Sequence, residues 1–127
     1  MSASTTDYIQ YRIDKSNEIF EDAKLLAENE LWNSCVNRLY YSSFYIVTAL
    51  LANSGVNAES HNGVKRQFNL LFVKTGKISK DQGKLFSNLF DWRQETDYAD
   101  FIEFDEDTVK PLLTQVKNFI ETIRQVI

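Results

Sequence analysis

The amino-acid sequence predicts an all-α protein folded as an up-and-down bundle of four to five helices. Chain-breaking residues are scarce, because four Gly and one Pro in 127 residues make up about 4% of the chain, against about 12% in average proteins. Apolar residues recur at three- and four-residue steps in five segments, and no alternating strand pattern lasts more than a few residues. With 43% apolar and 13% aromatic residues, residues 1–127 can form one domain with its own core, and residues 1–6 are expected to be a flexible N-terminus.

The first two helices are predicted over residues 7–28 and 30–53. The first carries a single apolar stripe, whereas the second is apolar on more than one side, which places it at the centre of the bundle. Asn53, Ser54 and Gly55 end the second helix. The residues expected to be buried are Ile9, Ile13, Phe20, Ala23 and Ala27 in the first helix and Trp32, Val36, Leu39, Tyr40, Phe44, Val47 and Leu51 in the second.

The third and fourth helices are predicted over residues 60–75 and 79–96. Ser60 is a candidate N-cap and Gly76 a candidate C′ residue for the third. Ser79 and Gln82 have the spacing of a capping box at the start of the fourth. The residues expected to be buried are Val64, Phe68, Leu71 and Phe72 in the third helix and Leu85, Phe86, Leu89 and Phe90 in the fourth.

Residues 97–107 are predicted to be a loop, and residues 108–126 form the last helix. Pro111 would lie in about the first turn, where a missing N–H costs little. Short connections between long helices favour antiparallel neighbours, and hence an up-and-down bundle. The apolar stripe of the last helix consists of Val109, Leu112, Val116, Phe119, Ile120 and Ile123.

Composition narrows the possible chemistry. A single cysteine, Cys35, and a single histidine, His61, exclude an internal disulfide and the usual Cys/His zinc sites. Cys35 is interpreted as a small buried hydrophobic residue. Eight acidic residues between positions 91 and 107 lack the ligand spacing of a calcium loop. No metal and no cofactor are therefore expected.

Charge and hydropathy also bear on location and partners. Residues 64–84 hold six basic residues and one acid, which suits either a phosphate backbone or a solvated helix face. Residues 1–6 do not resemble an export signal. Residues 39–58 carry no charge. Their apolar part, roughly residues 40–52, is too short to cross a membrane. We therefore expect a cytoplasmic protein without a membrane anchor.

Arg93 is the first candidate for function. It follows Phe86, Leu89 and Phe90 at offsets of seven, four and three, so it projects from the apolar face of its helix. A guanidinium in that position needs a partner, because burying it alone is costly. Either it forms a structural bridge to Asp97 four residues on, or it is directed at a phosphate in a cleft.

His61 and one face of the second helix are further candidates. His61 lies near the start of the third helix, where the helix dipole disfavours the imidazolium form, so a neutral ring is expected. Such a ring can act as a general base or as a hydrogen-bonding partner in the core. Polar and aromatic residues on the buried second helix indicate either a contact surface or intramolecular hydrogen bonds. These residues are Asn37, Arg38, Tyr41 and Tyr45.

The run from Trp32 to Phe44 resembles a signature of small HEPN-domain proteins (higher eukaryotes and prokaryotes nucleotide-binding). The resemblance continues in order along most of the chain, from about Asp7 to Phe119. It includes the segment from Ser60 to Val64, Phe68, Gly76, Arg93, Asp97 and Tyr98.

This resemblance implies a helical bundle that forms a homodimer. Many HEPN domains are RNA-cleaving toxins that are encoded beside a minimal nucleotidyltransferase, which neutralises them. Their active motif is an Arg and a His separated by four to six residues. This implies that Arg93 would stabilise charge on the phosphorane while a His moves the proton. Here the positions for that His hold Tyr98, Ala99 and Asp100, which argues against catalysis.

The favoured hypothesis is therefore a binding module that pairs with a nucleotidyltransferase and binds nucleotide or RNA without cutting it. Its binding residues would be Asn37, Arg38, Tyr41, Tyr45, Arg93, Asp97 and Tyr98. One alternative is a metal-independent ribonuclease toxin that uses Arg93 with His61 or Tyr98 as catalytic residues. A second alternative is a helical scaffold whose ligand is unrelated to nucleic acid.

Overall fold

The computed structural model describes residues 3–98 and 103–127 and consists of helices joined by short connections. Within these two ranges there is no strand, so the predicted all-α class is confirmed. The helices are α1 (Ala3–Glu28), α2 (Trp32–Asn53), α3 (His61–Phe68), the π-helical turn η1 (Asn69–Val73), α4 (Lys80–Tyr98) and α5 (Glu106–Val126).

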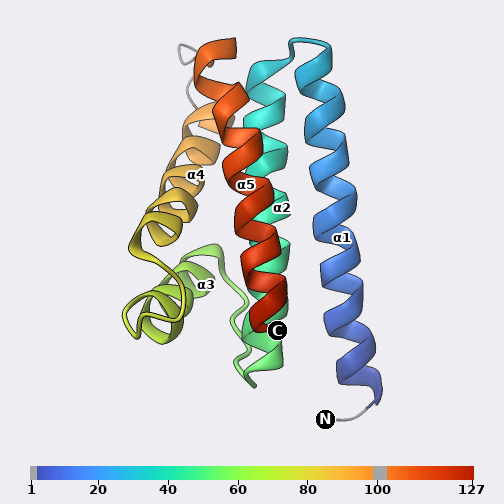
Figure 1. Cartoon of the computed structure of the whole chain (residues 1–127), viewed down its shortest axis with the longest axis vertical. Helices are drawn as coiled ribbons and strands as arrows, with labels where there is room; N and C mark the ends of the chain where they lie inside the picture. The colour runs from blue at the N-terminus through green and yellow to red at the C-terminus, as the bar shows by residue number, and fades with distance from the viewer. Residues whose placement is uncertain (1–2, 99–102) are drawn as a thin grey trace.

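Four long helices, α1, α2, α4 and α5, alternate in direction as an up-and-down bundle, and α3 lies beside the start of α4 (Figure 1). α2 contacts α1, α3, α4 and α5. Its buried residues cover more than one side of the helix. The central position predicted for this helix is therefore confirmed, and every other α-helix can place side chains against it.

Several helix boundaries differ from the prediction by a few residues. α2 begins at Trp32 rather than at residue 30, and α4 ends at Tyr98 rather than at residue 96. α1 begins at Ala3, so residues 3–6, expected to be flexible, are helical. α5 begins at Glu106, two residues early, because Asp105 serves as its N-cap and accepts a hydrogen bond from the Thr108 N–H at 2.9 Å. Pro111 consequently lies in the second turn of α5, where it is exposed and leaves one carbonyl of the first turn to solvent.

The third helix contains a feature that the sequence did not predict. Ser60 caps its start by accepting the Gly63 N–H at 2.9 Å, and Gly76 has φ +81°, as expected for these two residues. Between them the helix widens into η1, where the Lys74 N–H donates to the Asn69 carbonyl at 2.8 Å.

The start of α4 is held by hydrogen bonds of Gln82 and by close packing of Gly83. Ser79 accepts the Gln82 N–H at 3.2 Å, which confirms half of the predicted capping box, and the Gln82 amide donates to Thr122 of α5 at 3.2 Å. At the next residue, Gly83, an added Cβ would lie 2.9 Å from both methyl carbons of Val73 in η1. α4 therefore approaches η1 closely only because residue 83 has no side chain.

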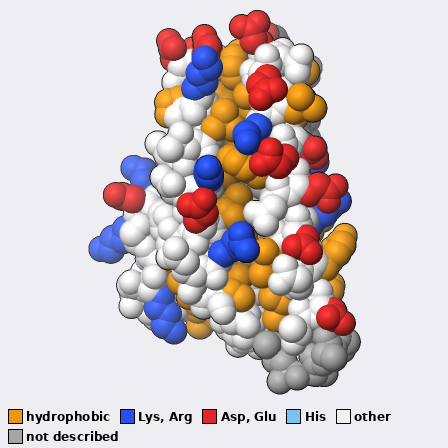
Figure 2. Space-filling view, turned by 45° about the vertical axis from the view of Figure 1, so that its right-hand side comes forward, with side chains coloured by type: hydrophobic (Ala, Val, Ile, Leu, Met, Phe, Trp, Pro, Cys, Tyr) orange, Lys and Arg blue, Asp and Glu red, His pale blue; other side chains and the backbone are white. Residues whose placement is uncertain are grey.

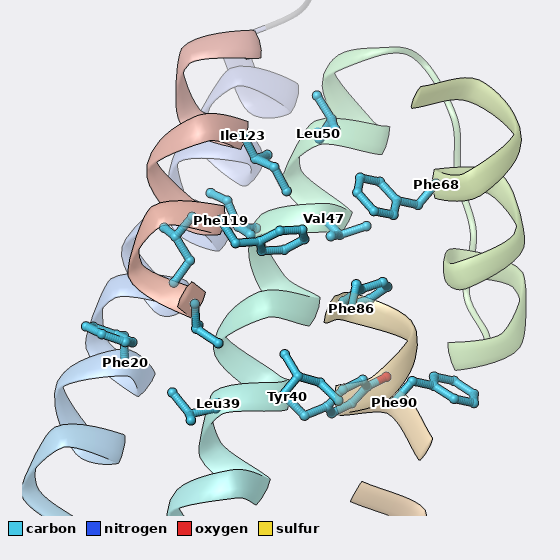
Figure 3. Close-up of a cluster of buried hydrophobic side chains, with 14 of the residues drawn as sticks. Phe20, Leu39, Tyr40, Val47, Leu50, Phe68, Phe86, Phe90, Phe119 and Ile123 are labelled. Atoms are coloured by element: carbon cyan, nitrogen blue, oxygen red, sulfur yellow. The ribbon is translucent and has the colours of Figure 1, made fainter. Parts of the chain in front are cut away.

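The core is built around aromatic rings from three helices. Phe86 of α4 stacks on Phe119 of α5 with ring centroids 5.9 Å apart, and Phe68 of α3 meets Phe86 edge-on at 5.4 Å (Figure 3). Together with Phe72, which stacks on Phe68, these four buried phenylalanines are called the apolar ring cluster. All six residues of the predicted α5 stripe are buried, which confirms it.

Two smaller buried groups complete the interior. Cys35 has no exposed surface, and burial raises the pKa of its thiol to about 11, in agreement with the predicted structural role. Ser16 of α1 is buried, although the apolar pattern did not predict it. Its hydroxyl donates to the Ser42 carbonyl of α2 at 2.7 Å. This hydrogen bond between α1 and α2 satisfies the hydroxyl inside the core.

Candidate functional site

Residues from three helices meet around two tyrosines of α2. The Tyr40 hydroxyl and His61 Nδ1 are 2.6 Å apart, and the Arg93 guanidinium carbon lies 5.3 Å from the Tyr40 ring centroid. Arg93 also donates from Nη1 to the Tyr41 hydroxyl at 3.3 Å, and the Tyr41 and His61 rings meet edge-on at 6.0 Å. Arg93 and His61, 32 positions apart in the sequence, therefore share both tyrosines.

The local fold explains how these side chains converge. Tyr40 lies beside Phe86 and Phe90 of α4, with ring centroids 6.1 and 6.0 Å away (Figure 3). His61 is the first residue of α3, where the Ser60 cap begins the helix, and it stacks on Phe44 at 4.4 Å. Tyr40, Tyr41, Phe44 and His61 are called the polar ring cluster below.

Burial sets the protonation of this cluster. It raises the pKa of Tyr40, and the nearby Arg93 charge offsets only part of that rise, so the phenol stays protonated at neutral pH. Burial, followed by the Arg93 charge, lowers the pKa of His61 from 6.5. The neutral imidazole expected from the sequence thus has its main physical cause in burial, whereas the sequence argument relied on the helix dipole.

The hydrogen bond to Tyr40 also determines which atom of His61 can act. Because Nδ1 is engaged, His61 can meet a ligand through Nε2. If the Tyr40 hydroxyl donates to Nδ1, Nε2 carries the ring proton and donates; in the other tautomer Nε2 has a lone pair and accepts. The same geometry therefore suits a hydrogen bond to a phosphate oxygen or the removal of a proton.

The predicted face of α2 adjoins the polar ring cluster. Arg38 donates from Nε and Nη2 to the Asn37 side-chain oxygen at 3.1 and 2.7 Å, and its guanidinium carbon lies 5.1 Å from the Tyr41 ring centroid. Tyr41 thus has Arg38 over its ring and Arg93 at its hydroxyl. Tyr45 meets Phe44 edge-on at 6.1 Å. Asn37, Arg38, Tyr41 and Tyr45 are all partly exposed, as a contact surface requires.

Two predicted site residues cannot be placed against this cluster. Asp97 and Tyr98 belong to the last turn of α4, but their side chains lie outside the described residues. The Arg93–Asp97 bridge, one of the two alternatives for Arg93, involves one of these side chains and lies outside the described residues too.

Tyr40 is the site residue that sequence reasoning missed, because it was assigned only to the core. It is fully buried, yet its hydroxyl hydrogen-bonds to His61. A tyrosine in a buried apolar stripe, where a phenylalanine would pack equally well, indicates that the hydroxyl has a partner inside the fold. That signal was present in the sequence, but the identity of the partner was not.

The other surfaces of the described residues do not bring the predicted site residues together. A groove of about 660 Å³ between α1 and α5 includes Phe20, Lys24 and Ile120 in its lining but none of the predicted site residues. An apolar strip on the face shown in Figure 2 is flanked by charged side chains of both signs. Within residues 3–98 and 103–127, no three metal-binding side chains gather, and no helix is long and apolar enough to span a membrane.

Comparison with known proteins identifies the family of this chain. A "UPF0332 protein" of Thermotoga maritima is 41% identical over 119 residues, covering 94% of this chain and 90% of that protein. Two proteins of Methanocaldococcus jannaschii, named "Putative toxin MJ0605" and "Putative toxin MJ0142", are 30% and 29% identical and cover 92% and 89% of this chain. They are themselves covered over 87% and 77% of their lengths. The family model described as HEPN domain matches residues 9–126, and this chain therefore belongs to the HEPN family.

Proposed function

We propose that this chain is the RNA-binding or nucleotide-binding HEPN component of a toxin–antitoxin-type module. It would act in the cytoplasm as a homodimer and pair with a minimal nucleotidyltransferase. Membership of the HEPN family and the toxin names of two relatives support the module type. The observation that carries the binding function is that Arg93 and His61 flank the same two tyrosines.

The chemistry of these groups suits a nucleic-acid phosphate. A guanidinium stays charged at all relevant pH values and presents several N–H donors to phosphate oxygens. His61 adds a neutral ring whose Nε2 can donate to the same group. Beside them, the partly exposed rings of Tyr41, Phe44 and Tyr45 offer surfaces on which bases can stack. The ligand class that fits all three elements is a single-stranded RNA or a nucleotide.

RNA binding is tested by fluorescence anisotropy with a labelled single-stranded RNA. Arg93→Ala removes a charged hydrogen bond of about 1.5–3 kcal/mol and should weaken binding about 10–100-fold. Arg124→Ala is the matched control, because Arg124 is an exposed arginine near the end of α5, and it should bind as the parent does. If the parent fails to bind RNA and nucleotides, the proposal is wrong, and a helical scaffold with an unrelated ligand is the better hypothesis.

Metal-independent RNA cleavage is the second candidate function, and the shared tyrosine contacts of Arg93 and His61 favour it. In that reaction the 2′-oxygen bonds to phosphorus while the bond to the 5′-oxygen breaks. His61 Nε2 takes the 2′-hydroxyl proton, the leaving 5′-oxygen takes a proton from water, and Arg93 stabilises the phosphorane. The protonated imidazole then gives its proton to the hydroxide left behind. The products carry a 2′,3′-cyclic phosphate and a 5′-hydroxyl. Tyr98 remains the alternative proton carrier from the sequence.

Cleavage is tested on the same RNA with a chelator present. Cleavage by the parent that is lost in both Arg93→Ala and His61→Ala would identify a ribonuclease. Equal cleavage by all three preparations would identify a contaminant, and cleavage by none would leave the binding function. Light scattering measures whether the chain is a dimer, and co-expression with a minimal nucleotidyltransferase encoded beside it measures whether the two proteins copurify.

A further inference from the structure

A third cation lies next to the polar ring cluster. Lys65 is one helical turn after His61 on α3, and its ammonium is 4.6 Å from the ring centroid of Phe90 on α4. The Phe90 and Tyr40 ring centroids are 6.0 Å apart, and the Arg93 guanidinium lies over Tyr40. Lys65 and Arg93 therefore hold positive charges over two neighbouring rings, one delivered from α3 and the other from α4.

The surroundings of Lys65 leave its charge effective. Its side chain is partly exposed, and no carboxylate of the described residues lies within 4.0 Å of its ammonium. The Phe90 ring beneath it is 96% buried and attracts the cation through its π face without neutralising it. In the sequence, the segment 64–84 that contains Lys65 carries six basic residues and one acid. The Lys65 ammonium therefore keeps a positive charge that an anion can approach.

We propose that Lys65 contacts a second phosphate, so that the site takes at least two consecutive phosphates of a single-stranded RNA in preference to a mononucleotide. This inference rests on the proposed function. A mononucleotide brings one phosphate, which Arg93 and His61 can bind together. A polynucleotide places its next phosphate along the strand, and the cation over the adjacent ring is positioned to receive it. Lys65 is thus a residue that determines ligand length.

The salt dependence of RNA binding tests this assignment. Each phosphate contact to a single strand contributes about 0.7 to the slope of log affinity against log salt. Lys65→Gln should therefore lower that slope by about 0.7 and weaken RNA binding several-fold at low salt. Lys117→Gln is the control, because Lys117 is exposed on α5 and loses the same charge. Circular dichroism of each variant checks the fold, and Lys65→Arg should restore the slope.

Competition with short ligands tests the number of phosphates. In the parent, the 5′-phosphorylated dinucleotide pUpU should compete better than UMP. Lys65→Gln should remove this advantage and leave the affinity for UMP unchanged. An unchanged salt slope, or an equal loss of UMP binding, would overturn the assignment while RNA binding by the parent still stood. Failure of the parent to bind RNA would instead overturn the proposed function itself.

Discussion

The two ring clusters of this bundle are neighbours. Both are held together by stacked and edge-on rings, but only the polar ring cluster contains hydrogen-bonding side chains. In the apolar ring cluster, Phe86 stacks on Phe119 and meets Phe68 edge-on. In the polar ring cluster, His61 stacks on Phe44 at a centroid distance of 4.4 Å and hydrogen-bonds to Tyr40. Tyr40 and Phe86 connect the two clusters, with ring centroids 6.1 Å apart.

The two clusters differ in what burial costs their side chains. The phenylalanine side chains have no polar atoms, so burying them removes apolar surface from water without leaving a hydrogen-bonding group unpaired. The phenol and the imidazole lose solvent on burial and need each other as partners, a cost that stability alone does not require. The proposed binding function of Arg93 and His61 would account for polar groups placed beside an apolar core that does not need them for stability.

The largest effect is expected from truncating the apolar ring cluster. Phe86 is 1% exposed, and Phe86→Ala should lower the free energy of unfolding by about 3–5 kcal/mol through lost burial and the cavity left behind. Phe44→Ala, at a partly exposed ring of the other cluster, should cost less than half as much. Urea denaturation followed by circular dichroism measures both. Equal losses of unfolding free energy would show that the two clusters stabilise the fold to the same extent, which would contradict the comparison.

A smaller effect is expected from removing one hydroxyl. Tyr40→Phe keeps the ring in place but removes the hydrogen bond to His61, so it should lower the free energy of unfolding by about 1 kcal/mol. The same urea titration measures this, and a loss as large as that of Phe86→Ala would contradict the separation of the two clusters.

The smallest effect is a change in the protonation of His61. The Arg93 charge contributes to the lowered pKa of His61, so Arg93→Gln should raise that pKa toward 6.5 with little change in stability. An NMR titration of the imidazole signals measures it directly, because His61 is the single histidine of the chain. Arg38→Gln is the control, since Arg38 is not among the causes of the shift; an equal rise in both variants would contradict the assignment.

The sign of the linked pH dependence follows from the same shift. The folded protein holds His61 with a pKa below 6.5, so between the two pKa values the unfolded chain binds more protons. The stability contributed by the neutral imidazole is fully present above about 6.5, the unfolded pKa. It is lost as the pH falls from there through the folded pKa. His61→Gln should lack this pH dependence. Urea denaturation of the parent and of this variant at several pH values measures it as the difference between their unfolding free energies.

Local sequence signals anticipated the helices well. The α5 stripe, the Ser60 cap and the positive φ of Gly76 each depend on residues within one or two turns, and all three were predicted. The early start of α5 at Glu106 was missed because the apolar pattern begins only at Val109, after the Asp105 cap.

The site was predicted less completely, for a physical reason. Arg93, His61 and Tyr41 were identified one by one from their helix faces, but their convergence depends on how α2, α3 and α4 pack. The Tyr40–His61 hydrogen bond joins residues 21 positions apart, and no periodicity encodes such a pairing. The sequence supplied the candidates, and tertiary packing decided which of them share a partner.

The π-helical turn η1 has a consequence for how this chain can tolerate changes in length. Its hydrogen bond from Lys74 to Asn69 spans five residues where an ordinary helical turn spans four, so the segment holds one residue in excess. Deleting one of residues 69–71, which leaves Phe72 and Val73 in place, would restore regular α-helical bonding and keep the following residues in phase. A deletion elsewhere in the same helix would rotate every later side chain by about a quarter turn. Among the described helices, this turn is where evolution or an engineer can shorten the chain with the least disturbance to the ring clusters.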